Sequence, residues 1–150
     1  MLKSCLVAVT ATGLSLVASA QQMKPESQIK LRQSAYTLMN YNLSILDAMA
    51  SGKRALNKDE AVRAAEMLAM VSTVPRGFFG EGTGGEPTRA KPEIWTNRAD
   101  FDAKMDKMVN EAAKLPAAAR TGDAGTLKKA VQDVDTACAS CHDDYRLKRR

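Results

Sequence analysis

Apolar side chains recur at helical spacing in four stretches of the chain, and the first of them covers residues 25–50. It begins at Pro25, which is tolerated in a first helical turn, and Gly52 lies just past its end. Its apolar positions make two neighbouring stripes: Ala35, Leu38, Ile45 and Met49, and then Tyr36, Met39, Leu43, Leu46 and Ala50. Together they are wider than one core-facing stripe needs. This helix is therefore either well buried or packed along one edge against a second subunit.

Three further helices are predicted at residues 57–74, 97–115 and 123–148. Asn57 and Glu60 resemble a capping box at the start of the second helix, and Pro75 closes it. Pro116 and Gly122 mark the turn before the fourth helix, for which Asp123 is a good N-cap. The first and third connections are short, so we predict an all-α fold, an antiparallel up-down-up-down four-helix bundle.

The connection over residues 75–92 is long and holds five glycines. Long loops without secondary structure of their own are usually functional or disordered. Because this one also carries Phe78 and Phe79, we expect it to be buried against something.

The first 20 residues are typical of a secretory signal peptide. Lys3 precedes an apolar stretch over residues 6–18, and Ala18-Ser19-Ala20 gives a small-residue cleavage pattern. We expect cleavage after Ala20, which removes Cys5 and leaves residues 21–150 as one domain. A retained membrane anchor is the alternative, but the stretch is short for a transmembrane helix. We therefore expect no membrane insertion after cleavage.

The chain is basic, with a formal net charge of +5, and much of the excess lies at its end. That tail holds Arg146, Lys148, Arg149 and Arg150. Few aromatic residues and no recognised motif argue against a nucleic-acid partner. The tail is either a solvated helix end that suits the helix dipole or a docking surface for an acidic redox partner.

Candidate chemistry is concentrated in the run Cys138-Ala139-Ser140-Cys141-His142. C-x-x-C-H is the attachment pattern of a c-type haem, in which two thiols bond the haem and the adjacent imidazole binds iron. A thioredoxin-like pair would follow a strand, and a structural zinc site would need a fourth ligand. We predict one haem c, covalently attached through Cys138 and Cys141, with iron ligated by His142. Attachment of such a haem fits an oxidising compartment, so we expect a periplasmic location.

His142 is the only histidine in the chain, so the iron cannot have two histidine ligands. The opposite position must carry a methionine, a weaker ligand or nothing. Met39, Met105 and Met108 are nominal candidates, although their helical spacing favours core packing.

Four stretches of the sequence resemble the cytochrome c′ family, periplasmic four-helix-bundle haem proteins. They are Arg32-Gln33-Ser34-Ala35-Tyr36, Phe79-Gly80-Glu81-Gly82-Thr83, Lys91-Pro92-Glu93-Ile94-Trp95, and residues 138–146. All c-type cytochromes share C-x-x-C-H, so the other three stretches make the resemblance specific. The resemblance implies a five-coordinate, high-spin haem with an apolar open distal face. It also implies a homodimer built through the first helix.

The same resemblance implies roles for individual residues around the haem. Tyr36 would lie over the open iron face, where a low-spin subgroup of the family has a ligating methionine. A neutral phenol is a poor iron ligand, so Tyr36 is expected to shield the site, or to be a plain core aromatic. The other assignments are Phe79 and Met108 in the distal pocket, Arg32, Gln33 and, more weakly, Thr88 at a haem propionate, and Arg146 beside the proximal pocket. An exposed surface arginine is the alternative for Arg32.

These features predict a gas-binding protein rather than an enzyme. An apolar distal face without a hydrogen-bond donor gives bound O₂ little stabilisation, so NO and CO are the expected ligands, in NO scavenging or protection. A one-electron carrier between periplasmic redox partners is the alternative function. Peroxidase-like turnover is disfavoured because it normally requires a distal acid-base group such as histidine.

Overall fold

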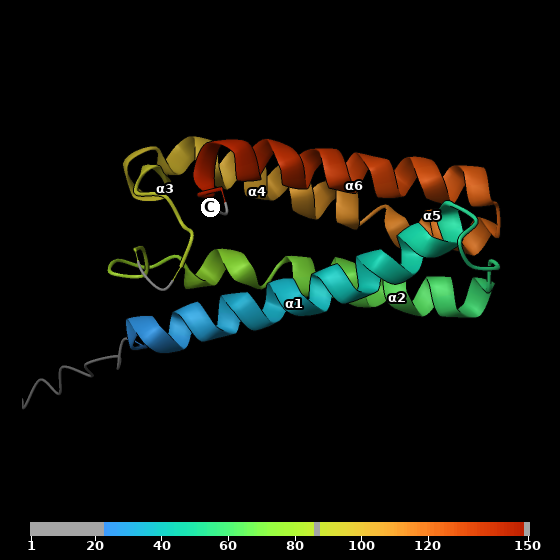
Figure 1. The fold of residues 1–150 in the computed structure, drawn as a ribbon, viewed down its shortest axis with the longest axis horizontal. Helices are drawn as coiled ribbons and strands as arrows, with labels where there is room; N and C mark the ends of the chain where they lie inside the picture. Colours follow the sequence, from blue (N-terminus) through green and yellow to red (C-terminus); the bar gives the residue numbers. More distant parts are fainter. Residues whose placement is uncertain (1–22, 86–87, 149–150) are drawn as a thin grey trace, which may run out of the picture.

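The computed structural model describes residues 23–85 and 88–148, and within them the chain folds as a helical bundle (Figure 1). The elements are α1 (Pro25–Ala50), α2 (Lys58–Ser72), the 3₁₀ helix η1 (Pro75–Phe78), α3 (Glu93–Thr96), α4 (Arg98–Ala112), α5 (Leu115–Thr121) and α6 (Ala124–Tyr145). The long helices α1, α2, α4 and α6 alternate in direction, which confirms the predicted four-helix bundle. The signal peptide predicted for residues 1–20 lies outside the described residues.

Three of the predicted helix starts are set by the expected residues. Pro25 occupies the first turn of α1. The Asn57 side chain caps α2 by accepting a hydrogen bond from the Glu60 amide at 3.0 Å. The Asp123 carboxylate caps α6 by accepting one from the Thr126 amide at 2.7 Å. Each cap satisfies an amide that the helix itself leaves without a partner.

The predicted ends of the last two long helices are wrong. α4 stops at Ala112, and Pro116 lies in the first turn of the separate helix α5 instead of in a turn. Proline suits that position because its missing amide would have had no helical partner. α6 ends at Tyr145 rather than near residue 148, because Arg146 adopts an extended backbone conformation and pairs with Ala90 in an isolated antiparallel bridge.

The bundle has two hydrophobic clusters of different character. The first is aliphatic and joins α1, α2, α5 and the first half of α6; its largest members are Leu46, Met49, Leu68, Leu115, Leu127, Val131 and Val134. The second is rich in aromatic rings and methionines and lies towards the end of α6; its members are Met39, Phe79, Ile94, Phe101, Met105, Met108, Ala137 and Tyr145. In it, the Phe101 ring meets the rings of Phe79 and Tyr145 edge to face, at centroid distances of 4.8 and 5.3 Å.

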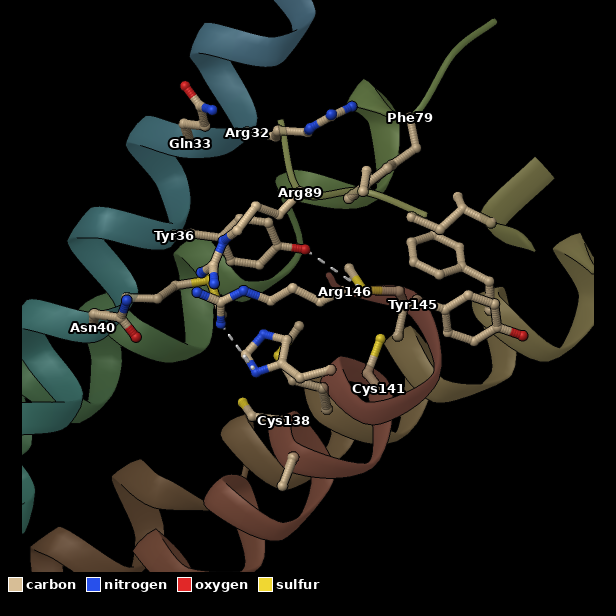
Figure 2. A pocket seen from close by; sticks show the side chains of 18 of the residues that line it. Arg32, Gln33, Tyr36, Asn40, Phe79, Arg89, Cys138, Cys141, Tyr145 and Arg146 are labelled. Carbon is tan, nitrogen blue, oxygen red and sulfur yellow. Dashed lines mark hydrogen bonds between the residues drawn. The ribbon is translucent and has the colours of Figure 1, made fainter. Parts of the chain in front are cut away.

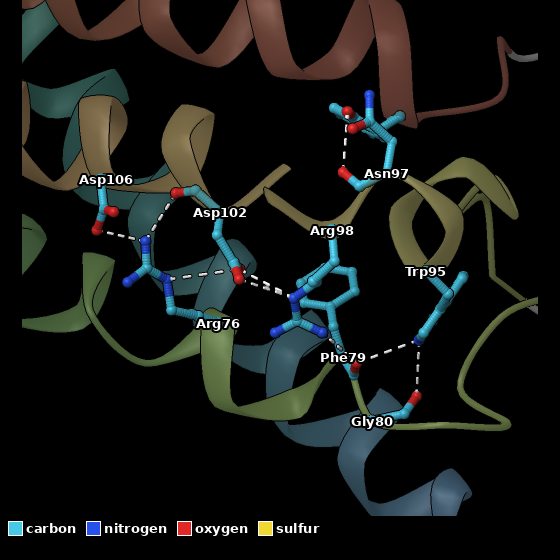
Figure 3. A network of polar contacts seen from close by, with 9 residues as sticks. Arg76, Phe79, Gly80, Trp95, Asn97, Arg98, Asp102 and Asp106 are labelled. Carbon is cyan, nitrogen blue, oxygen red and sulfur yellow. Dashed lines mark hydrogen bonds and ion pairs between the residues drawn. The ribbon is translucent and has the colours of Figure 1, made fainter. Parts of the chain in front are cut away.

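Polar contacts hold the loop after η1 against α3 and α4 (Figure 3). The Phe79 carbonyl accepts hydrogen bonds from the Trp95 indole at 3.2 Å and from the Arg98 guanidinium at 3.1 Å. The same indole also donates to the Gly80 carbonyl at 3.0 Å. Phe79 is thereby fixed by its backbone as well as by its ring.

Ion pairs reinforce this attachment from the side of η1 (Figure 3). Arg76 contacts the carboxylates of Asp102 and Asp106 and donates to the Asp102 backbone carbonyl at 2.7 Å. Arg98 pairs with the same Asp102 carboxylate at 3.0 Å. The alternating charges fasten η1 to α4.

In the part of the chain that the structure describes, no helix is both long and apolar enough to cross a bilayer.

Replacement of Trp95 by Phe tests the loop attachment. The variant keeps an aromatic ring, although a smaller one, and leaves the Phe79 and Gly80 carbonyls without the indole donor, so the free energy of unfolding should fall by about 1–2 kcal/mol. Urea unfolding followed by circular dichroism measures this. The exposed neighbour Thr96, changed to Ala, serves as the control and should shift stability by less than about 0.5 kcal/mol. Equal stability of Trp95→Phe and wild type would contradict the attachment.

Candidate haem site

A cavity of about 720 Å³ lies between α1, α4 and α6, and the loop that follows η1 closes part of it (Figure 2). Protein interiors normally hold few voids larger than a water molecule. A space of this size is therefore a site for a large group and not a packing defect, and it falls within the usual range for cofactor sites.

The α6 wall of the cavity carries the reactive side chains. Cys138 and Cys141 are three residues apart on α6, so both thiols lie on the face that lines the cavity. Both are free and half-buried. Burial raises the pKa of each thiol to about 11, with a further contribution from Asp135 at Cys138 and from Cys138 at Cys141. His142 follows directly and lines the same cavity.

His142 is exposed at the edge of the cavity. Partial burial of its ring and the positive charge of Arg89 lower the pKa of its imidazole. Both effects favour the neutral form, which is the form that binds a metal. The imidazole Nδ1 lies 3.4 Å from the Arg146 guanidinium.

The remaining walls fit a flat, apolar group that carries negative charges. Apolar side chains predominate among them, including Met39, Leu68, Phe101, Met105 and Met108. Among the described residues, the lining of the whole cavity includes three arginines, Arg32, Arg89 and Arg146, but only one carboxylate, that of Asp135. Guanidinium groups suit carboxylates geometrically, so this excess of positive charge fits the two propionates of a haem.

Every site residue predicted from the sequence lines this one cavity. They are Arg32, Gln33, Tyr36, Phe79, Thr88, Met108, Cys138, Cys141, His142 and Arg146. The sequence reasoning missed Arg89, which also lines the cavity. Its position depends on backbone pairing between residues far apart in the chain, so no local motif marks it.

Tyr36 faces the cavity from α1, across from the cysteines (Figure 2). Its hydroxyl donates to the Met105 sulfur at 3.8 Å. Burial is the main reason why the pKa of Tyr36 lies well above its usual value, and the nearby Cys141 thiol raises it further. The phenol therefore stays neutral. Met39, Met105 and Met108 are all buried in the cluster around the cavity.

Arg32 does not behave as an exposed surface arginine. It is 3% exposed, its guanidinium donates to the carbonyls of Phe78 and Thr83, and it lies 4.5 Å above the centre of the Phe79 ring. Arg32 therefore organises the loop that covers the cavity. Thr88 is buried and accepts a hydrogen bond from the Ala90 amide, whereas Gln33 is exposed at the cavity edge.

A helical bundle with a cofactor-sized cavity and C-x-x-C-H on its wall defines a c-type cytochrome of the bundle class. The sequence matches the family model for cytochrome c′ over residues 27–146. The chain belongs to the cytochrome c′ family, whose members bind haem c.

Individual relatives agree with this assignment. The chain is 42% identical over 132 residues to the cytochrome c′ of Rubrivivax gelatinosus, covering 85% of this chain and all of the relative. The solved structure of a cytochrome c′ from the same organism superposes with a TM-score of 0.79 at 38% identity, over 85% of this chain and 100% of the other. The structure of a nitric oxide complex of a variant cytochrome c′ from Alcaligenes xylosoxidans superposes with a TM-score of 0.79 at 36% identity. The match covers 86% of this chain and 100% of the other.

Tyr145, in the last turn of α6, gives the site a pH-dependent tie to α4. Its hydroxyl donates to the Asp100 carboxylate at 2.6 Å. This hydrogen bond is the largest contribution, and burial the second, that raises the pKa of Tyr145 to about 12. The unfolded chain loses the phenol proton near pH 10, while the folded protein retains it. The tie therefore stabilises the fold below pH 10 and is lost as the pH rises from about 10 to 12.

Replacement of Tyr145 by Phe should remove this alkaline dependence. We expect the variant to be less stable than wild type at pH 8, and the difference to shrink as the pH approaches 12. Urea unfolding at several pH values between 8 and 12 measures both. The control is Tyr41→Phe, because Tyr41 is 63% exposed. A constant difference between wild type and Tyr145→Phe across this range would contradict the assignment.

Proposed function

We propose that this protein is a periplasmic c-type haem protein with five-coordinate, high-spin iron that binds NO and CO and serves in NO scavenging or protection. The proposal includes no enzymatic activity. The observation that carries the proposal is the asymmetry of the cavity. One wall presents Cys138, Cys141 and His142, and the facing wall presents a neutral phenol whose hydroxyl is turned to a thioether.

Different residues of the chain would attach the haem, bind its iron and shape the space for the gas. Cys138 and Cys141 would hold the haem by thioether bonds, and His142 would bind the iron from the α6 side. The haem, when bound, would supply the iron to which a diatomic gas binds. Tyr36 and Phe79 would exclude water from that position and crowd the entering ligand. Because the Tyr36 hydroxyl is directed at Met105, bound O₂ would gain little stabilisation.

Relatives support the choice of ligand and of compartment. Structures of four variants of the Alcaligenes xylosoxidans cytochrome c′ are nitric oxide complexes, and two of them superpose on this chain with a TM-score of 0.79. The signal-like pattern of residues 1–20 and the C-x-x-C-H run fit export to the periplasm.

Absorption spectra of the ferric and ferrous protein, with and without CO, test the function. We expect high-spin spectra in both oxidation states and a ferrous protein that binds CO. Tyr36→Met places a thioether at the position that faces the iron and should convert the iron to a low-spin form that binds CO at least about tenfold more weakly, a loss of about 1.4 kcal/mol.

Tyr36→Leu is the matched control, since it removes the phenol without supplying a ligand. It should stay high-spin and take up CO faster than wild type. A low-spin ferrous wild type that refuses CO would overturn the proposal.

An electron carrier is the second candidate function, and it is favoured by charge around the exposed His142. Arg89, Lys91, Arg146 and Lys148 lie close together in the chain or across the Ala90–Arg146 bridge. Such a basic surface could dock an acidic redox partner. Electron-transfer rates that fall steeply with ionic strength would support this function.

We also propose a homodimer built through α1. Leu31, Leu38 and Tyr41 are 42%, 40% and 63% exposed, so an apolar edge of α1, which includes Leu38 of the predicted stripes, remains uncovered within a single chain. The side chains of Leu38 and Tyr41 also line a shallow groove on this helix. A second copy would cover this surface.

Leu38→Glu tests the dimer. At a symmetric interface the buried charge would be present in both subunits. The dissociation constant of the dimer should therefore rise at least about a hundredfold, which corresponds to about 2.8 kcal/mol. Sedimentation velocity over a range of protein concentrations measures this. Lys128→Glu, at an exposed residue of α6, is the control for an added negative charge outside α1. A monomeric wild type, or a Leu38→Glu variant that stays dimeric, would contradict the α1 interface.

A further inference from the structure

A short backbone pairing brings Arg89 to the edge of the cavity beside His142. Residues 89–91 run antiparallel to residues 145–147: the Lys91 amide donates to the Tyr145 carbonyl at 3.0 Å, and the Leu147 amide donates to the Arg89 carbonyl at 2.8 Å. Ala90 and Arg146 form the bridge between them. The loop is thereby fixed to the chain immediately after the helical turn that carries His142.

Both arginines of this pairing turn into the cavity. Arg89 and Arg146 line it, and Figure 2 shows both side chains within the pocket. The Arg146 guanidinium lies 3.4 Å from Nδ1 of that ring, and Arg89 is close enough for its charge to lower the pKa of the imidazole. Arg89 also donates to the Leu147 carbonyl at 3.4 Å, which limits its freedom.

Neither guanidinium has a carboxylate partner within residues 23–85 and 88–148. Of the two acidic residues that follow His142, Asp144 is paired with Lys104 at 2.9 Å, whereas the charge of Asp143 raises the pKa of the His142 imidazole and so opposes Arg89. Two like charges at the edge of the same half-enclosed cavity repel each other, and an anion bound between them would offset that repulsion. Arg32, the guanidinium expected at a propionate, is already bonded to loop carbonyls.

The contact between Arg146 and His142 is available only in one tautomer. A guanidinium donates and never accepts, so Nδ1 must accept in this contact and the ring proton must lie on Nε2. When Nε2 of a neutral imidazole binds iron, the proton lies on Nδ1, and both groups are then donors. His142 ligation would therefore release the Arg146 guanidinium for another acceptor.

We propose that Arg89 and Arg146 form a two-guanidinium oxyanion site at the edge of the cavity, next to His142. Its ligand is a carboxylate or an inorganic oxyanion, which the two planar forks can hold in a bidentate manner. The oxyanion comes either from a propionate of the haem or from solution. The proposal rests on the proposed function, since it places the site beside a haem bound by His142.

The test uses the haem-loaded protein and three variants: Arg89→Gln, Arg146→Gln and the control Arg63→Gln. Arg63 is an exposed arginine of α2 that does not line the cavity. Two quantities are measured. Resonance Raman spectra give the propionate bending frequency, which falls when a propionate loses hydrogen bonds. Isothermal titration with inorganic phosphate gives binding from solution.

Two results would support the site and identify its ligand. A lower bending frequency in Arg89→Gln and Arg146→Gln, but not in Arg63→Gln, assigns the site to a propionate. Phosphate that binds wild type about one to one, and at least about tenfold more weakly to both cavity variants, assigns it to an oxyanion from solution. Arg89→Lys should give an intermediate result, because it keeps the charge but loses the planar fork.

The proposal is overturned if both variants match Arg63→Gln in bending frequency and in phosphate binding. Arg89→Lys and Arg146→Lys, which keep the charge, cover the case in which a glutamine variant fails to fold. The haem spectrum and CO binding of wild type report separately on the proposed function. Their failure would contradict the function, while the phosphate titration would still decide whether Arg89 and Arg146 bind an oxyanion.

Discussion

At one end of this bundle the helices enclose a cofactor-sized cavity instead of packing directly against one another, and much of the structure at that end holds the walls of this cavity in place. A cavity of about 720 Å³ remains between α1, α4 and α6. Within the described residues, the side chains at that end line the cavity without filling it, so polar contacts supplement the packing of its walls. Arg32, Trp95 and Arg98 hold the loop carbonyls, and the Ala90–Arg146 bridge fixes the loop to the end of α6.

α6 connects the packed end with the open end. Its first half contributes Leu127, Val131 and Val134 to the aliphatic cluster. Its second half presents Cys138 and Cys141 to the cavity on the same side of the helix. The reactive groups thus stand on a rigid element that is anchored elsewhere, which is how precise sites are usually supported.

Much of the fold could be predicted because its signals are local. Pro25, Asn57 and Asp123 each determine a helix start within one turn of chain, and the four-three spacing of α6 places both cysteines on the inner face. Helix ends were less predictable. Proline at position 116 serves a helix start as well as a turn, and the end of α6 depends on pairing with residue 90, far away in sequence. Arg89 was missed for the same reason. The resemblance placed Arg32 at the cavity, but only the structure shows that its donors are directed at loop carbonyls.

The position of the cysteines in the cavity wall also determines how a cofactor would be retained there. A cofactor that binds reversibly must be retained by the pocket walls, and a pocket built for retention resists the small movements that admit other molecules. Two thioether bonds from α6 would make occupancy of this cavity an intramolecular event with a high effective concentration, even where the walls contribute little affinity. The walls facing His142 would then be free to vary in shape and crowding without loss of the cofactor. A covalent tether would thus allow a single residue such as Tyr36 to change which molecules enter while the bundle around it stays the same.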